Sequence, residues 1–114
     1  MTRLELAAHR PWVIAHRGAS WVFPENTAAA FRRALRARPD GIELDVQFSK
    51  DGVPVVYHDE TLAKITGDDR TISELSLAEL KRLDLGSWFD ARFRGERLLT
   101  LAQALTLCGG GSWL

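Results

Sequence analysis

The sequence predicts a domain of the α/β class, and three patterns along the chain support this prediction. An apolar run at residues 12–15 ends in the polar pair His16-Arg17, as a buried strand ends in a sharp turn. An amphipathic helix is expected over residues 27–38, and residues 42–48 alternate between apolar and polar side chains. A strand, a helix and another strand in this order are typical of α/β proteins.

Length, charge and cysteine content narrow the possibilities. The 114 residues suffice for one domain or a piece of one, and 15 basic residues balance 15 acidic ones. The absence of a basic excess argues against a general nucleic-acid binder. One cysteine permits no disulfide within the chain, and no apolar run approaches the roughly 18 residues of a transmembrane segment. We therefore expect a cytoplasmic protein, with residues 1–10 as an N-terminal extension.

The first helix has clear start and stop signals. Asn26 or Thr27 can cap its N-terminus, and the segment 39–41, Pro-Asp-Gly, ends it. One face is apolar, whereas the arginines fall elsewhere and are expected to face solvent. The apolar face consists of Ala30, Phe31, Ala34 and Leu35, and the arginines are Arg32, Arg33 and Arg36.

A hairpin is expected next. The pair Asp51-Gly52 is a strong turn signal between the alternating segment 42–48 and a second apolar strand, 53–57, which ends at His58-Asp59. The connection is too short for a helical crossover, so the strands should be antiparallel. A two-residue turn would place Asp45 opposite His58, with Glu43 two residues along the same face.

Two later helices are predicted from capping boxes. Ser76 and Glu79 open a short helix that extends to about Leu83, and Thr100 and Gln103 open another that extends to about Cys108. Three glycines end the second helix, and residues 112–114 have the pattern of the start of another strand.

The predicted hairpin gathers groups that can carry chemistry. Leaving polar groups unpaired on one face costs free energy, and this face would carry Glu43, Asp45 and His58. A bound divalent cation would offset that cost, and carboxylate oxygens suit Mg²⁺ or Ca²⁺. The alternative is a solvent-facing strand with incidental acids. His16 and His58 both close apolar strands, and two imidazoles can serve as acid and base in phosphodiester cleavage. Arg17 could grip a phosphate or form a surface salt bridge.

Glu25 belongs to the segment 24–27, Pro-Glu-Asn-Thr, which most simply turns the chain and caps the first helix. Its carboxylate could also hold a hydroxyl or a histidine near the site. Both uses are left open by the sequence pattern.

Several spaced motifs together resemble the glycerophosphodiester phosphodiesterase family. They are Ile-Ala-His-Arg-Gly-Ala-Ser at 14–20, Pro-Glu-Asn-Thr at 24–27 with Ala30-Phe31, Glu-Leu-Asp-Val at 43–46, Asp51-Gly52, Val-Val-Tyr-His-Asp at 55–59, and residues 80–89. The resemblance implies a TIM-type β/α barrel with its site at the barrel mouth. It implies that His16 and His58 are the acid–base pair, that Glu43 and Asp45 ligate a divalent cation, and that Arg17 contacts the phosphate.

The reaction implied by the resemblance is hydrolysis of a glycerophosphodiester to glycerol 3-phosphate and an alcohol such as choline or ethanolamine. The cation would neutralise the phosphoryl oxygens. Two alternatives remain at this point: a phospholipase C-like or D-like relative that acts on lipid phosphodiesters, and a fragment without catalytic activity.

The length of the chain bears on these expectations. A complete barrel takes about 250 residues, so residues 11–114 are expected to form the N-terminal portion of the family's domain. The family's third acidic ligand is expected beyond residue 114, and we expect the isolated chain to be inactive or nearly so. Its open strand edges should favour aggregation or pairing with another chain.

Overall fold

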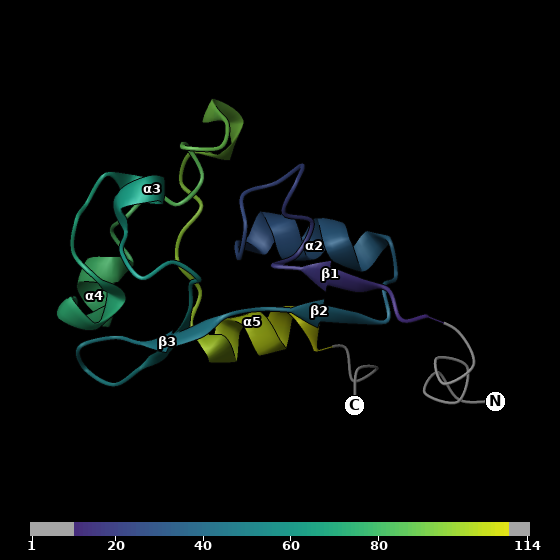
Figure 1. Ribbon diagram of the computed structural model, residues 1–114, viewed down its shortest axis with the longest axis horizontal. Coiled ribbons are helices and arrows are strands. Elements are labelled where there is room, and N and C mark those ends of the chain that lie inside the picture. Colours follow the sequence, from purple (N-terminus) through teal and green to yellow (C-terminus); the bar gives the residue numbers. More distant parts are fainter. Residues whose placement is uncertain (1–10, 110–114) are drawn as a thin grey trace.

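The computed structural model describes residues 11–109 and begins with a parallel strand pair. Strands β1 (Ile14–His16) and β2 (Gly41–Glu43) pair so that His16 lies opposite Glu43. Helix α2 (Ala28–Arg36) connects them and lies beside β1 (Figure 1). This strand–helix–strand unit confirms the α/β class, and it brings the carboxyl ends of β1 and β2 to the same edge.

Helix α2 begins as the sequence predicts. The hydroxyl of Thr27 caps the helix by accepting a hydrogen bond from the backbone N–H of Ala30 at 3.2 Å. Ala30, Phe31 and Ala34 are buried, and the three arginines of the helix are exposed. The amphipathic pattern therefore places the helix correctly, although it ends at Arg36, two residues before the expected end.

The hairpin exists and is antiparallel, but its predicted register is wrong. Strand β3 (Val46–Phe48) pairs with β4 (Pro54–Val56), with Gln47 opposite Val55. The predicted strand 42–48 is interrupted between β2 and β3. Asp45 accordingly lies beside Tyr57, whose backbone N–H donates to the carbonyl of Asp45 at 2.9 Å.

The turn explains this one-residue slip. The backbone N–H of Ser49 donates to the carbonyl of Val53 at 2.9 Å, so three residues lie between the paired positions. Gly52 has a φ of 79°, which suits the left-handed position of a three-residue loop. The Ser49 side chain stabilises this loop by accepting from the backbone N–H of Val53 at 2.9 Å.

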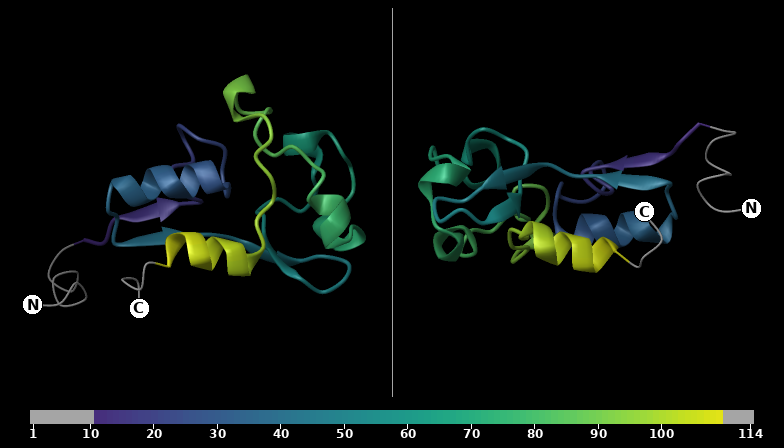
Figure 2. Two further views of the ribbon diagram at one scale, coloured as in Figure 1. Left: turned by 180° about the vertical axis from the view of Figure 1, so that it is seen from behind. Right: turned by 90° about the horizontal axis from the view of Figure 1, so that it is seen from below.

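Short helices follow before the last long one. Helix α3 (Ala63–Thr66), the 3₁₀ turn η1 (Ile72–Glu74), α4 (Leu77–Leu80) and the 3₁₀ turn η2 (Ala91–Phe93) precede α5 (Leu101–Cys108). Both predicted capping boxes are present, although α4 ends before Leu83. The views agree that α3 and α4 lie at one end of the molecule, whereas α5 runs beside α2 and the strands (Figures 1 and 2).

Strand β4 separates two hydrophobic cores. Val55 and Tyr57 belong to the larger core, which is built mainly from the segment between β4 and α5. Val56 belongs to the smaller core, where it packs with Phe31 of α2 and Ala104 of α5. The other members of the larger core are Leu62, Ile65, Ile72, Leu75, Leu80, Leu85 and Leu98.

The prediction that the first strand is buried is wrong. Trp12, Val13 and Ile14 are all exposed, although their apolar character is typical of a buried strand. Within residues 11–109, β1 pairs only with β2, so its other edge has no neighbouring strand to cover it. An apolar run indicates a strand, but it does not say what covers it.

Two predictions fall outside residues 11–109, namely the N-terminal extension at residues 1–10 and the strand at residues 112–114. Within the described residues, no helix has the length and apolar character needed to cross a membrane.

Candidate active site

The candidate site lies at the carboxyl ends of β1 and β2, where His16 and Glu43 lie side by side. Nε2 of His16 is 3.1 Å from Oε2 of Glu43. The next backbone N–H, of Arg17, donates to the carbonyl of Glu43 at 2.8 Å. The parallel register therefore joins a predicted acid–base residue to a predicted metal ligand. Both side chains are partly exposed, as groups that meet a ligand must be.

Arg17 forms a largely buried ion pair, where the sequence left open a surface one. Its Nη1 lies 3.1 Å from Oε2 of Glu25, and these side chains are only 17% and 10% exposed. Its Nε lies 3.5 Å from Oδ2 of Asp45, too far for a hydrogen bond, and is buried without a hydrogen-bond partner. A buried donor without a partner costs free energy. An acceptor from a ligand would remove that cost.

Asn26 is a site residue that sequence analysis missed. It is 3% exposed, and its Nδ2 donates to Oδ2 of Asp45 at 3.2 Å. Its Oδ1 is buried without a hydrogen-bond partner. Asn26 also adopts a left-handed φ of 57°, and its backbone N–H donates to the carbonyl of Arg17 at 2.9 Å. From the sequence, Asn26 is a possible helix cap and a member of the motif at 24–27, and no local pattern identifies its contact with Asp45.

His58 pairs with its neighbour in the sequence. Nδ1 of His58 lies 2.8 Å from Oδ1 of Asp59. Burial acts to raise the pKa of Asp59, but the hydrogen bond with His58 and the positive charge of Lys64 outweigh it, so this pKa is lowered. Asp59 is therefore ionised at neutral pH. An ionised carboxylate can only accept a hydrogen bond, so Nδ1 of His58 carries a proton.

Lys64 joins the two halves of the site and was also missed. Its Nζ lies 3.2 Å from Oε1 of Glu25 and 3.6 Å from Oδ2 of Asp59. In the structure Glu25 holds Arg17 and Lys64. Lys64 lies on α3, 39 positions from Glu25, and no local sequence pattern predicts this ion pair.

The prediction that Glu43, Asp45 and His58 share one face of the hairpin is wrong. Glu43 pairs with His16, Asp45 is held by Asn26 near Arg17, and His58 pairs with Asp59. The one-residue slip in the hairpin is the reason, because it places Tyr57 beside Asp45. Four of the five predicted residues, His16, Arg17, Glu43 and Asp45, still contact one another in pairs, whereas His58 is connected to them only through Asp59, Lys64 and Glu25.

A different group in this region has the spacing of a metal site. Glu25, His58 and Asp59 each offer a ligand atom, and these atoms lie within 4.8 Å of one another. Such a group could hold a divalent cation. In the structure, however, the ammonium group of Lys64 already contacts both carboxylates of this group. No contact with a lysine is found for Glu43 or Asp45 in the described part of the chain; Glu43 contacts the imidazole of His16, and Asp45 lies beside the guanidinium of Arg17.

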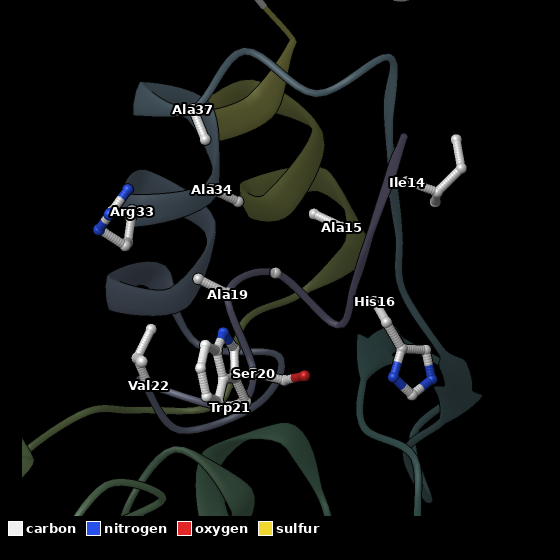
Figure 3. Close-up of a pocket in the computed structure, with 11 residues that line it drawn as sticks. Ile14, Ala15, His16, Ala19, Ser20, Trp21, Val22, Arg33, Ala34 and Ala37 are labelled. Carbon is white, nitrogen blue, oxygen red and sulfur yellow. The ribbon is translucent and has the colours of Figure 1, made fainter. Parts of the chain in front are cut away.

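A hollow of about 370 Å³ lies next to the site, between β1, the loop 18–22 and α2 (Figure 3). Its lining is mostly apolar and includes Ile14, Trp21 and Ala34. His16 is the only predicted site residue that borders it, and Figure 3 shows the imidazole away from the side chains of α2. The charged groups that could bind a phosphodiester therefore lie beside this hollow and not inside it.

Comparison with known proteins places the chain in a family. Residues 16–111 match the glycerophosphoryl diester phosphodiesterase family, and the chain belongs to it. The chain is 49% identical, over 102 residues, to a glycerophosphodiester phosphodiesterase of Caldanaerobacter subterraneus subsp. tengcongensis. That alignment covers 90% of this chain and 42% of the relative.

Solved structures agree with this assignment. A phosphodiesterase of Oleispira antarctica, in complex with the product sn-glycerol-3-phosphate, superposes with a TM-score of 0.84 at 38% identity, covering 96% of this chain and 43% of that one. A glycerophosphodiester phosphodiesterase of Agrobacterium tumefaciens str. C58 gives a TM-score of 0.80 at 43% identity, covering 84% and 42%. The chain thus spans about two fifths of these relatives and folds as the first part of a TIM-type barrel. Divalent cations are used in this family.

Proposed function

We propose that this chain is the N-terminal portion of the catalytic domain of a metal-dependent glycerophosphodiester phosphodiesterase. The whole enzyme would hydrolyse glycerophosphodiesters to glycerol 3-phosphate and an alcohol. The observation that carries the proposal is a row of contacts that begins at the His16–Glu43 pair and ends at the Asp59–His58 pair. Arg17, Glu25 and Lys64 connect these two pairs, and Asp45 lies beside the guanidinium of Arg17. The product bound in the Oleispira antarctica relative supports the same substrate class.

Glu43 and Asp45 are the proposed ligands of a divalent cation, Mg²⁺ or Ca²⁺. The donor set fits a hard cation, because two carboxylates and the unpartnered Oδ1 of Asn26 offer oxygen atoms in one region. The cation, when bound, would neutralise charge on the phosphoryl oxygens.

Arg17 is the proposed phosphate contact. Its guanidinium has five N–H donors, and only one of them is used by Glu25. The buried Nε has no partner and can donate to a phosphate oxygen. Glu25 fixes the guanidinium in place, so that less side-chain freedom is lost when the phosphate binds.

His16 and His58 are the proposed acid–base pair. One imidazole takes the proton of the attacking group, and the other gives a proton to the leaving alcohol. The contact with Asp59 keeps the proton on Nδ1 of His58, which leaves Nε2 for that transfer. The cytoplasm remains the expected location on the sequence argument alone.

A chimera tests this proposal directly. Residues 11–109 would replace the aligned part of the Caldanaerobacter relative, and hydrolysis of glycerophosphocholine would be followed by ³¹P NMR with Mg²⁺ or Ca²⁺. We expect EDTA-sensitive turnover that His16→Ala and His58→Ala each reduce at least about 100-fold, with Glu60→Gln as an exposed control. The proposal fails if the folded chimera is inactive under conditions in which the relative is active. Preference for a lysophospholipid over glycerophosphocholine would favour the lipid phosphodiester alternative.

A further inference from the structure

A row of alternating charges crosses much of the candidate site and ends at the imidazole of His58. It begins at Asp45, a proposed metal ligand, and continues through Arg17, Glu25, Lys64 and Asp59, which contacts His58. Successive members approach within 2.8–3.6 Å. Lys64 is the only member that comes from the segment 61–98, and all the others come from the strand ends and the loops next to them. Its position is therefore set by a different part of the fold from the groups that it joins.

The two carboxylates on either side of Lys64 need a positive charge between them. Glu25 and Asp59 offer ligand atoms within 4.8 Å of one another, and their side chains are only 10% and 22% exposed. Two carboxylates this close repel each other, and partial burial weakens the screening of that repulsion by water. Lys64 lies within 3.6 Å of both and offsets it.

Lys64 is also held in place from another side. Its Nζ lies 5.2 Å from the ring centroid of Trp88, which is a cation–π contact. The backbone carbonyl of Leu85 accepts a hydrogen bond from Nε1 of Trp88 at 2.9 Å, which fixes the indole. Lys64 therefore has contacts on two sides of its ammonium group, although its side chain is 47% exposed.

The orientation of His58 depends on Asp59. A carboxylate that accepts from Nδ1 fixes both the ring orientation and the tautomer, and it leaves Nε2 free to exchange a proton with a substrate. Without Lys64, the repulsion from Glu25 would favour rotation of Asp59 away from Glu25. That rotation would break the contact at Nδ1 of His58.

We propose that Lys64 is a positioning residue, which holds Asp59 against Nδ1 of His58 and so presents Nε2 of His58 to the phosphodiester. This inference rests on the proposed function for its catalytic meaning, whereas the geometry that it asserts belongs to this chain alone. Lys64 does not touch the reacting atoms in this scheme. It acts through Asp59, with Trp88 and Glu25 fixing its ammonium group.

The first experiment reads the tautomer of His58 in the 114-residue chain by long-range ¹H–¹⁵N NMR at about pH 8, where imidazoles are neutral. The chain has three histidines, and the signals of His58 are identified by their loss in His58→Gln. We expect the Nδ1–H form in the native chain. Lys64→Met should shift the ratio of the two His58 tautomers about tenfold toward Nε2–H, which is the size expected for losing a hydrogen bond to a charged group. Lys64→Arg should restore the native ratio.

Controls separate positioning from a loss of folding. Lys50→Met makes the same change at an exposed lysine in the turn of the hairpin, at the opposite end of β3 and β4 from His58, and it should leave the tautomer unchanged. Amide spectra would verify that the larger core is intact, and Lys64→Gln replaces Lys64→Met if the latter unfolds. The proposal is overturned if the folded Lys64 variant keeps the native tautomer ratio.

A second readout links positioning to the reaction. In the chimera described above, Lys64→Met should lower kcat at least about tenfold with little change in KM, while Lys64→Arg retains most of the rate. A chimera that is inactive with Lys64 present refutes the proposed function but leaves the NMR result to decide the positioning role. An equal loss in KM and kcat, or no loss, would overturn the catalytic part of the inference.

Discussion

Nη1 of Arg17 lies 3.1 Å from Oε2 of Glu25 in an ion pair that is largely shielded from water. Glu25 at the same time contacts Lys64 through its other oxygen. Breaking a shielded ion pair leaves charges without compensation, which costs far more than breaking an exposed one.

We predict that Glu25→Gln destabilises the protein by about 2 kcal/mol, less than for a fully buried pair because Lys64 reaches solvent. Urea unfolding at neutral pH would measure the change. Glu60→Gln is the matched control, since Glu60 is exposed and follows the same site in the sequence. Equal stabilities of the two variants would show that the ion pair carries no net free energy.

Gly18 and Gly52 form a second matched pair. Both have a left-handed φ, of 80° and 79°, but a Cβ on Gly18 would lie 2.8 Å from the backbone of Ala30, whereas a Cβ on Gly52 would meet nothing. We predict that Gly52→Ala lowers the free energy of unfolding by about 1 kcal/mol, through backbone strain alone. Gly18→Ala should lower it by at least about 2 kcal/mol more, because α2 must move to admit the new Cβ. Thermal unfolding would compare them, and a similar cost for both would contradict the close contact with Ala30.

Asp84 should make stability depend on acid pH. Hydrogen bonds from the Ser87 hydroxyl and the backbone N–H of Gly86 lower the pKa of Asp84 to about 2, from an ordinary value of 3.8. Because the folded pKa is depressed, its contribution is present above about pH 4 and is lost as the pH falls through about 2. We predict that Asp84→Asn lowers the free energy of unfolding by about 1 kcal/mol at neutral pH, a value reduced for solvent screening. The variant should also lose less stability than the native protein as the pH falls.

The check is a series of urea unfolding curves between pH 2 and pH 7, each taken on both proteins. The difference between native protein and Asp84→Asn should shrink as the pH falls. A difference that stays constant across this range would mean that the carboxylate charge of Asp84 contributes nothing.

Cation binding provides a further prediction. We expect Glu43→Gln and Asp45→Asn each to weaken the affinity for Mg²⁺ or Ca²⁺ about tenfold or more in calorimetric titrations of the chain, because each removes a charged oxygen ligand. Glu60→Gln should bind as the native chain does. If Glu25→Gln or Asp59→Asn has the larger effect, the cation binds at the group around Lys64 instead.

Local features of this fold could be predicted from the sequence, and contacts between distant segments could not. The caps at Ser76 and Thr100 are predicted correctly, and Thr27 is one of the two caps expected for the first helix, because a cap involves residues three positions apart. The hairpin was found but shifted by one residue, since its loop length depends on the side chain of Ser49 as well as on Asp51-Gly52.

The candidate site shows the same division. The residues proposed for chemistry were named from the sequence, but their partners were not. Lys64 and Asn26 act through contacts with residues that lie 39 and 19 positions away, and such contacts leave no periodic signal. The exposure of β1 could not be foreseen either, because an apolar run does not indicate how many strands flank it.

The alternation along β4 has a consequence for how the molecule opens. Val55 and Tyr57 belong to the larger core and Val56 to the smaller one, and the two cores share a strand but no side chain. Each core can therefore unfold without removing side chains from the other core. Amide hydrogen exchange should resolve two cooperative units, one holding α3 and α4 and the other holding α2 and α5. The amides of β4, which both units cover, should exchange last.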